Sequence, residues 1–189
     1  MKDYMRPIAL KLTFILFAVL FFARCEKEET ETSHTEKNQL IYFQCDYRNS
    51  AWGYTHYGWI VDSAGNVFSY YSPVDWVYFD SLGTISDSAM LANLSATDTL
   101  CYQVTAHELS ENIDLINNAF LGTCSEPELE MYDAGTARYY AFKYDSITKI
   151  YNSVLVKQVG DFRVDNSSKA AIQIYEWLET VNTYVKYRH

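Results

Sequence analysis

Alternating hydrophobic and polar positions predict that the first part of the globular region consists of β-strands. Residues 40–47 alternate with period two, which is the pattern of a strand with one buried face. Residues 57–62 and 67–71 flank the turn Ser63-Ala64-Gly65-Asn66, in which Gly and Asn tolerate positive φ. We therefore predict a β-hairpin with a further strand beside it.

Two helices are predicted in the middle of the chain. Ser86 is a suitable N-cap for a short helix over residues 87–94. Thr105 and Glu108 have the spacing of a capping box, and apolar residues then recur at helical spacing as far as Gly122. The glycine is the expected end of this longer, amphipathic helix.

The last part of the chain predicts a hairpin and a final helix. Residues 136–145 and 149–159 are alternating aromatic and β-branched runs joined by a short polar turn. A helix is expected to open at Asn166 or Ser167. Its apolar stripe consists of Ala171, Ile174, Leu178, Val181 and Val185. Together these elements predict one α+β domain over residues 39–189, an antiparallel sheet with the two longer helices packed on one face.

The N-terminal segment has a different pattern. Basic residues dominate positions 1–11, and positions 12–23 are uninterrupted by charge. Crossing a bilayer takes about 20 apolar residues in a helix, so this run is better explained as a secretory signal than as a permanent span. Residues 25–37 are polar and acidic and cannot bury enough surface to fold.

The junction Phe22-Ala23-Arg24-Cys25, followed by the acidic run at 26–29, resembles the precursors of bacterial lipoproteins. The resemblance implies that residues 1–24 are a signal peptide, that Cys25 is acylated, and that residues 25–38 are a lipid-anchored tether. The membrane is then a partner through the lipid on Cys25. The location implied is the bacterial cell envelope, at the surface or periplasmic face of the outer membrane. The alternative is an uncleaved signal anchor in which Cys25 is incidental.

Charge and composition narrow the function. The net charge of −9 and the lack of a basic patch argue against nucleic-acid binding. No phosphate loop, dinucleotide glycine motif or nucleophile elbow occurs, so no cofactor is expected and the catalytic residues, if any, are unknown. The chain is rich in aromatic residues, with 17 Tyr, 10 Phe and 4 Trp.

The cysteines beyond position 25 predict one disulfide. Cys101 and Cys124 flank a segment expected to form a strand, a helix and a turn, which can return the chain to its start. Closing a loop of that size with a disulfide stabilises a fold by about 3 kcal/mol in the chain-entropy model. Cys45 lies in an alternating strand and is expected to be a small buried hydrophobe. No cysteine spacing indicates a metal site.

The aromatic-rich stretch before position 80 is the best candidate for a binding surface. Tyr and Trp combine a large apolar area with a polar edge, which suits stacking on glycans and protein hot spots. The candidate ligand-binding residues are Trp52, Tyr54, His56, Tyr57 and Trp76. The alternative explanation is structural, because half of the rings in alternating strands fill the core.

We therefore predict a lipid-tethered binding or interaction module of the cell envelope, with a glycan or an envelope protein as its ligand. The alternative is an envelope hydrolase that uses His56 with a carboxylate such as Asp62 or Asp75. A third possibility is a stabilising subunit whose acidic surface meets a basic neighbour. His107 and Glu111 lie one helical turn apart, but a second His is missing, so we expect a solvated face there and no metal site.

Overall fold

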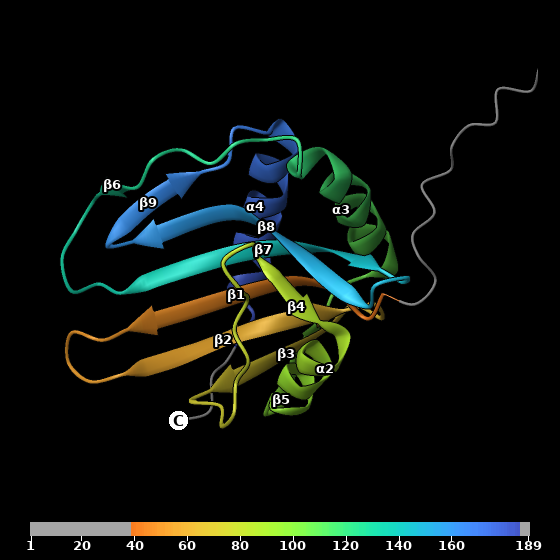
Figure 1. Cartoon of the computed structure of the whole chain (residues 1–189), viewed down its shortest axis with the longest axis horizontal. Coiled ribbons are helices and arrows are strands. Elements are labelled where there is room, and N and C mark those ends of the chain that lie inside the picture. The colour runs from red at the N-terminus through yellow and green to blue at the C-terminus, as the bar shows by residue number, and fades with distance from the viewer. Residues whose placement is uncertain (1–38, 186–189) are drawn as a thin grey trace, which may run out of the picture. The chain divides into compact units, whose positions relative to one another are not determined.

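The computed structural model describes residues 39–185, which lie in one compact unit and form a mostly antiparallel β-sheet with three helices (Figure 1). This arrangement is an α+β fold. The elements in chain order are β1 (Ile41–Asn49), β2 (Thr55–Asp62), β3 (Asn66–Tyr71), β4 (Thr84–Ser86), α2 (Asp87–Ser95), β5 (Thr99–Gln103), α3 (Ala106–Ala119), β6 (Glu128–Leu129), β7 (Thr136–Asp145), β8 (Ile150–Gly160), β9 (Phe162–Asp165) and α4 (Lys169–Asn182).

The strand β1 lies in the middle of the sheet, between β2 and β7. The strand order is β5-β3-β2-β1-β7-β8-β9-β6, and β4 pairs with β8 outside this path. In the register, Asp46 of β1 is opposite Gly58 of β2 and Arg138 of β7. Side chains alternate between the faces of a strand, so Gln44, Asp46 and Arg48 share one face of β1.

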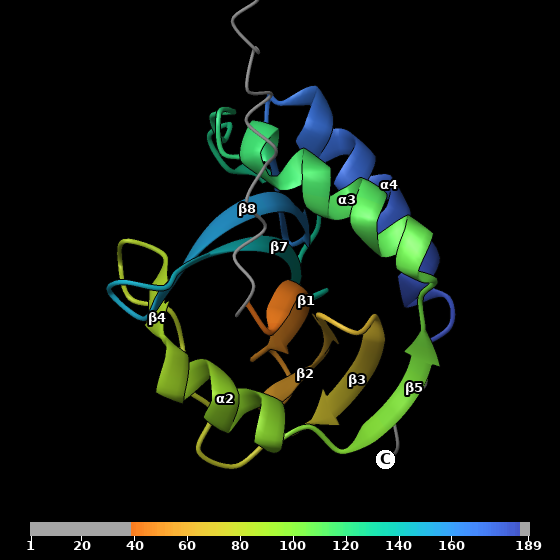
Figure 2. The ribbon, with the colours of Figure 1, turned by 90° about the vertical axis from the view of Figure 1, so that its right-hand side faces the viewer.

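One apolar cluster joins the sheet to α3 and α4, which lie side by side in Figure 2. Its completely buried members include Phe43, Trp59, Ala119, Ala141, Ile174 and Leu178. The indole Nε1 of Trp59 also donates a hydrogen bond of 3.0 Å to Oδ1 of Asn182, at the end of α4. The helices therefore depend on the sheet for both apolar and polar contacts.

A second apolar cluster contains Ile60, Tyr70, Met90 of α2 and Phe142. The chain between β3 and β4, residues 72–83, packs against it through aromatic rings such as Phe79. Asn93 of α2 fixes this segment, since its side chain accepts a hydrogen bond of 2.9 Å from the backbone N–H of Val77 and donates one of 2.7 Å to the Val77 carbonyl. The segment is thereby held over the sheet.

Most predicted elements are confirmed, including the Ser86 cap and the Thr105–Glu108 capping box. The final helix begins later than predicted: Ser168 is its N-cap, and the Ser168 hydroxyl accepts a hydrogen bond of 3.2 Å from the Ala170 N–H. The strands β4, β6 and β9 were not predicted. They contain only three, two and four residues, too few for an alternating pattern to show.

The predicted disulfide between Cys101 and Cys124 is not present in the structure, so this prediction is wrong. Cys101 lies on β5 and its Sγ atom is 3.0 Å from the Ser69 hydroxyl. Cys124 forms a β-bridge with Asn166, and its Sγ atom lies 3.9 Å from the Leu155 carbonyl of β8. In the sheet, β5 and β8 are separated by four strands. The sheet order, which loop length does not reveal, keeps the two thiols apart.

The predicted signal peptide, the acylated Cys25 and the tether over residues 25–38 lie outside the described residues. Within residues 39–185, none of the helices has both the length and the apolar character needed to cross a membrane. Cys45 is buried in the first apolar cluster, as its place in an alternating strand predicts.

Candidate functional site

A buried polar cluster surrounds Asp46 on β1. Asp46 is completely buried, and its Oδ1 atom lies 2.7 Å from Nε2 of His56 on β2. The Tyr70 hydroxyl donates to the same oxygen at 3.1 Å. Arg48, two residues further along β1, forms an ion pair of 2.7 Å with Oδ2. The buried carboxylate is therefore paired and hydrogen-bonded, as the cost of burying a charge requires.

Gly58 explains how Tyr70, which comes from β3, reaches β1 across β2. Gly58 is the residue of β2 directly opposite Asp46. A Cβ atom at position 58 would lie 2.4 Å from the Tyr70 hydroxyl oxygen and 2.1 Å from the Cys45 carbonyl oxygen. Only glycine leaves the space for this hydroxyl to enter the cluster.

The electrostatics of the cluster favour an ionised Asp46. Burial opposes its charge, but the hydrogen bond from His56 and the positive charge of Arg48 outweigh burial and lower the pKa of Asp46. Burial raises the pKa of Tyr70 well above its ordinary value, and the neighbouring Asp46 adds to this effect. At neutral pH the cluster therefore holds a carboxylate that accepts hydrogen bonds and a phenol that donates one.

His56 is enclosed by aromatic rings and only 2% exposed. The ring centroids of Tyr70, Trp76 and Tyr78 lie 5.4, 5.5 and 5.7 Å from the centroid of its imidazole. A substrate has no access to this imidazole in the structure. Its contacts instead describe a core histidine that holds two strands together.

The prediction that Asp62 or Asp75 is the carboxylate beside His56 is wrong. Asp62 accepts two backbone hydrogen bonds of 2.8 Å within the turn between β2 and β3. Asp75 lies in the segment over residues 72–83, with a φ of 58°. The partner of His56 is Asp46, which faces it from the adjacent strand.

The predicted binding residues Trp52 and Tyr54 lie in the exposed connection between β1 and β2. Their exposed fractions are 88% and 64%. The Tyr54 hydroxyl lies 2.7 Å from the Tyr78 hydroxyl, which connects this loop to the segment over residues 72–83. Trp76, also predicted, is half-buried, with its ring centroid 4.1 Å from that of Tyr70. The structure thus brings Tyr54 and Trp76 together around His56.

Tyr57 is separated from this group. It follows His56 along β2 and so points to the other face of the strand. There it stacks on Tyr47 with a centroid distance of 4.4 Å, and its centroid lies 6.2 Å from that of Tyr71. This aromatic row matches the structural alternative considered for the rings.

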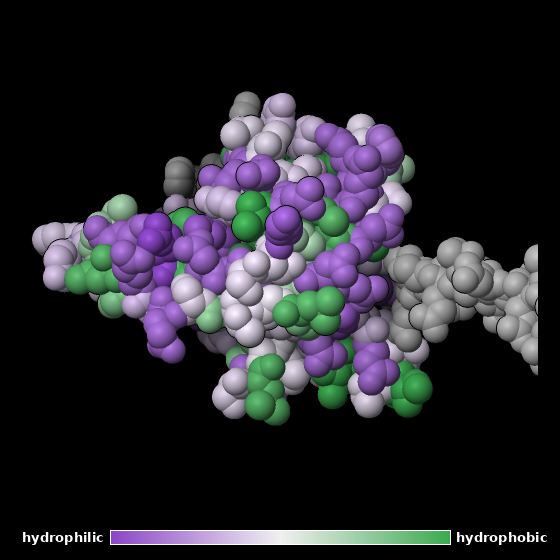
Figure 3. All heavy atoms as spheres, turned by 90° about the horizontal axis from the view of Figure 1, so that it is seen from above, coloured by the Kyte–Doolittle hydropathy of each residue, from purple (hydrophilic) through white to green (hydrophobic). Residues whose placement is uncertain are grey.

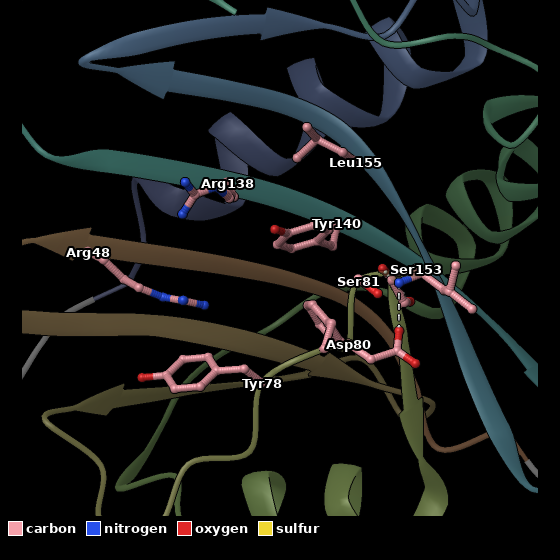
Figure 4. Close-up of a pocket in the computed structure, with 11 residues that line it drawn as sticks. Arg48, Tyr78, Asp80, Ser81, Arg138, Tyr140, Ser153 and Leu155 are labelled. Carbon is pink, nitrogen blue, oxygen red and sulfur yellow. Dashed lines mark hydrogen bonds between the residues drawn. The ribbon is translucent and has the colours of Figure 1, made fainter.

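A cleft of about 510 Å³, which we call the strand cleft, opens beside the buried cluster. Its walls come from β1, β7, β8 and the segment over residues 78–83, and they include Arg48, Tyr78, Arg138, Tyr140 and Ser153. Figure 4 shows Arg48 and Arg138 extending from neighbouring strands, with the Tyr140 hydroxyl pointing toward the same side of the cleft. The volume lies within the range of about 300–1,000 Å³ that small-molecule sites occupy.

A second cleft of about 450 Å³, the loop cleft, has Arg48 and Arg138 in its walls as well. Its remaining walls come from the ends of the strands and from the loops next to them: Asn49, Ser50, Ala51, Asp133, Gly135, Thr136 and Asp161. The strand ends β1, β7, β8 and β9 meet at the left of Figure 1. The two clefts therefore adjoin at the pair of arginines.

Hydrogen bonds fix the loop over residues 131–135, which borders the loop cleft. The Tyr47 hydroxyl donates to the Ala134 carbonyl at 2.7 Å, and Nδ2 of Asn49 donates to the Asp133 carbonyl at 3.1 Å. Oδ1 of Asp161 accepts from the Ala134 N–H at 2.8 Å. These hydrogen bonds therefore hold one wall of the loop cleft in place.

His107 lies on the exposed face of α3, beside Glu111. Its Nε2 lies 3.5 Å from the Glu111 carboxylate, and both side chains are exposed on α3. Among residues 39–185, no three His, Cys, Asp or Glu side chains are grouped so as to hold a metal ion. This helix face is the solvated one that the sequence predicts.

Asp46, Arg48 and Arg138 were missed by the sequence analysis. The available signal was the polar series Gln44, Asp46 and Arg48 at alternate positions of an otherwise apolar strand. Such a series in a buried strand indicates polar partners across the sheet. Arg138 had no comparable signal, because its place beside Asp46 depends on the pairing of β1 with β7.

Comparisons with protein-family models, with curated proteins and with solved structures found no match to this chain. The function therefore has to be inferred from the chemistry of the two clefts. Guanidinium groups, hydroxyl groups and an amide supply hydrogen-bond donors, and two exposed aromatic rings lie on the neighbouring loop. This combination suits binding of a polar ligand that has flat faces.

Proposed function

We propose that the protein is a lipid-tethered module of the bacterial cell envelope that binds glycans at its loop cleft. The single observation that carries the proposal is the exposed pair Trp52 and Tyr54 beside a polar cleft. Trp52 directly follows Ala51, which lines the cleft. The tether belongs to the proposal through the lipoprotein-like junction at Cys25. The domain would stand at the outer membrane, on its surface or its periplasmic face.

A sugar is the ligand that fits these walls best. Sugar rings carry hydroxyl groups around their edge and C–H groups on their faces, so they need polar partners and aromatic faces together. The loop cleft offers Asn49, Ser50 and Thr136 for the first requirement, and the neighbouring loop offers Trp52 for the second. In the view of Figure 3, hydrophilic residues cover most of the surface and hydrophobic ones are scattered in small groups.

The packing of the helices supports a ligand site on the opposite face of the sheet and its loops. We propose that α3 and α4 pack on one face of the sheet, opposite the face that carries the arginines. The support is the apolar cluster that both helices share with Phe43 and Trp59, whose side chains alternate with Gln44 and with Ile60 of the second cluster. The arginine face and the loops are then left for the ligand.

A hydrolase that uses His56 is the weaker hypothesis. The imidazole is buried, its Nε2 is engaged by Asp46, and aromatic rings separate it from the clefts. Catalysis by a general base needs an imidazole within hydrogen-bond reach of the substrate. The contacts of His56 support a structural role in the proposed module.

The test uses the full-length protein, purified in detergent, on a glycan array and in titration calorimetry with the glycans that bind. Trp52→Ala is expected to weaken binding at least tenfold, because it removes a stacking surface. The control is Ile147→Ala, which removes an equally exposed apolar side chain in the turn between β7 and β8. Binding of an envelope protein in place of any glycan, or equal affinities of the two variants, would contradict the proposal. Mass spectrometry of the native N-terminus tests the lipid, and an unmodified Cys25 thiol would refute that part.

A further inference from the structure

The two arginines that the clefts share are unusual features in a protein with a net charge of −9. Arg138 donates from Nε to Oε1 of Gln158 at 2.8 Å, and Gln158 in turn donates to the Phe162 carbonyl at 3.0 Å. Among residues 39–185, no carboxylate forms an ion pair with Arg138. The Gln158 contact orients the guanidinium through one N–H group and leaves its terminal nitrogens for another partner.

Arg48 lies on β1, the strand next to β7, which carries Arg138. Asp46 pairs with it, and its guanidinium carbon lies 4.1 Å from the centroid of the Tyr78 ring. Its Nε atom is buried and has no hydrogen-bond partner in the described part of the chain. Asp46 pairs with Arg48 only, so within residues 39–185 the charge of Arg138 has no carboxylate in ion-pair contact.

The Tyr140 hydroxyl completes the group. In Figure 4 the Tyr140 side chain lies on the same strand as Arg138 and its hydroxyl points toward the side where the two arginines lie. It has no hydrogen-bond partner among residues 39–185, and burial raises the pKa of Tyr140 to about 12, so it remains a donor at neutral pH. Two guanidinium groups and one hydroxyl therefore line the same cleft, and guanidinium groups bind carboxylates through strong, charge-assisted hydrogen bonds.

Three aspartates, Asp80, Asp133 and Asp161, also line the clefts, and the oxygens of Asp80 and Asp161 accept hydrogen bonds from the backbone of neighbouring loops. Asp80 accepts hydrogen bonds from the N–H of Leu82 at 2.9 Å and from the N–H of Thr84 at 2.7 Å. Asp161 accepts from the Ala134 N–H at 2.8 Å. These carboxylates lie in the walls as parts of loops, whereas the arginines and Tyr140 project from strands.

We infer that Arg48, Arg138 and Tyr140 bind the carboxylate of an acidic sugar, such as a uronic acid residue within a glycan. The inference rests on the proposed function and adds the chemical class of the ligand. A carboxylate held at the arginine pair lets its sugar extend into the loop cleft, toward the loop that carries Trp52. The strand cleft provides space for a neighbouring sugar of the same chain.

The test is titration calorimetry of the full-length protein in detergent with two matched sets of ligands. The first set contains oligosaccharides of galacturonate and of glucuronate, and the second contains the same oligosaccharides as neutral methyl esters. The acids are expected to bind at least tenfold more tightly than the esters. This difference in affinity should decrease as salt is added. Equal affinities of acid and ester, or no binding of any acid, would overturn the inference.

Two variants locate the carboxylate. Arg138→Gln should remove most of the difference in affinity between acid and ester. Tyr140→Phe, which keeps the ring and the fold, should reduce the ratio of the two affinities about threefold. The control is Arg163→Gln, which removes the same charge from an arginine already paired with Glu128 and Glu130. An unchanged gap in both site variants, or an equal loss in the control, would refute the assignment.

The outcomes separate this inference from the proposed function. If neutral glycans bind through Trp52 and the carboxylate brings no gain, the glycan-binding function stands and the acidic-sugar inference fails. If no glycan binds and Trp52→Ala changes nothing, the proposed function fails. Tighter binding of an acidic peptide than of any uronate would assign the arginine pair to a protein ligand and overturn the inference.

Discussion

Replacing Asp46 with asparagine removes the charge at the centre of the buried cluster while keeping the shape of the side chain. The substitution takes away the ion-pair partner of Arg48 and replaces the charged acceptor of His56 and Tyr70 with a neutral amide. Because Asp46 is completely buried, water cannot take the place of the lost carboxylate. The positive charge of Arg48 is then left without compensation.

The expected size of the effect follows from these contacts. Removing one partner of a buried ion pair destabilises a protein by about 3–5 kcal/mol. The Arg48 side chain is 31% exposed, so water solvates part of its charge and the lower end of the range applies. We expect a loss of about 3 kcal/mol in the free energy of unfolding, and a fall of about 6–12 °C in Tm for a domain of this size.

Urea unfolding followed by tryptophan fluorescence measures this loss. The control is Asp114→Asn, the same substitution at an exposed position of α3, for which we expect a change within about 0.5 kcal/mol. The folded state lowers the pKa of Asp46, so its contribution is complete above the ordinary value of 3.8 and is lost as the pH falls through the lower folded pKa. The gap between wild type and Asp46→Asn should therefore close in acid. A loss equal to that of the control, or a gap that is as wide at pH 3 as at pH 7, would refute the explanation.

Three further substitutions or labelling experiments test other parts of the structure. Gly135→Ala should reduce the free energy of unfolding by about 2 kcal/mol, because its φ of 72° is strained for alanine and the new Cβ would lie 2.6 Å from the Tyr47 hydroxyl oxygen; full stability in urea would contradict this. Thr105→Ala removes the capping box of α3, and a loss of about 1 kcal/mol is expected in thermal unfolding, against none if the cap is dispensable. A maleimide should label Cys124 in the folded protein and Cys45 only after unfolding, as peptide mapping can show; protection of Cys124 would argue against its exposed thiol.

Elements with strong local signals were predictable from the sequence. The capping box at Thr105 and the alternating run over residues 136–145 correspond to α3 and β7, because these signals depend only on neighbouring residues. The start of α4 was misplaced because the Asn166 side chain is engaged by a long-range contact with the Leu155 carbonyl of β8, at 3.0 Å. A local pattern of capping residues contains no information about such a contact.

The candidate site was predictable only in part. The exposure of Trp52 and Tyr54 on a loop was predictable, because this stretch contains a glycine and lies between two predicted strands. The pair of Arg48 and Arg138 was not predicted, because the two residues lie on strands that are far apart in the chain and adjacent only in the sheet. The same limit explains the wrong disulfide, because the distance between two cysteines depends on the order of strands.

The hydrogen bonds that Tyr47, Asn49 and Asp161 make to the loop over residues 131–135 have a consequence for recognition. A wall that is already ordered before a ligand arrives spares the complex most of the conformational entropy that a mobile loop loses on association. Under the proposed function, selectivity at the loop cleft would come from a shape that already exists in the free protein. Glycans of a different shape would then be excluded without a rearrangement of the backbone.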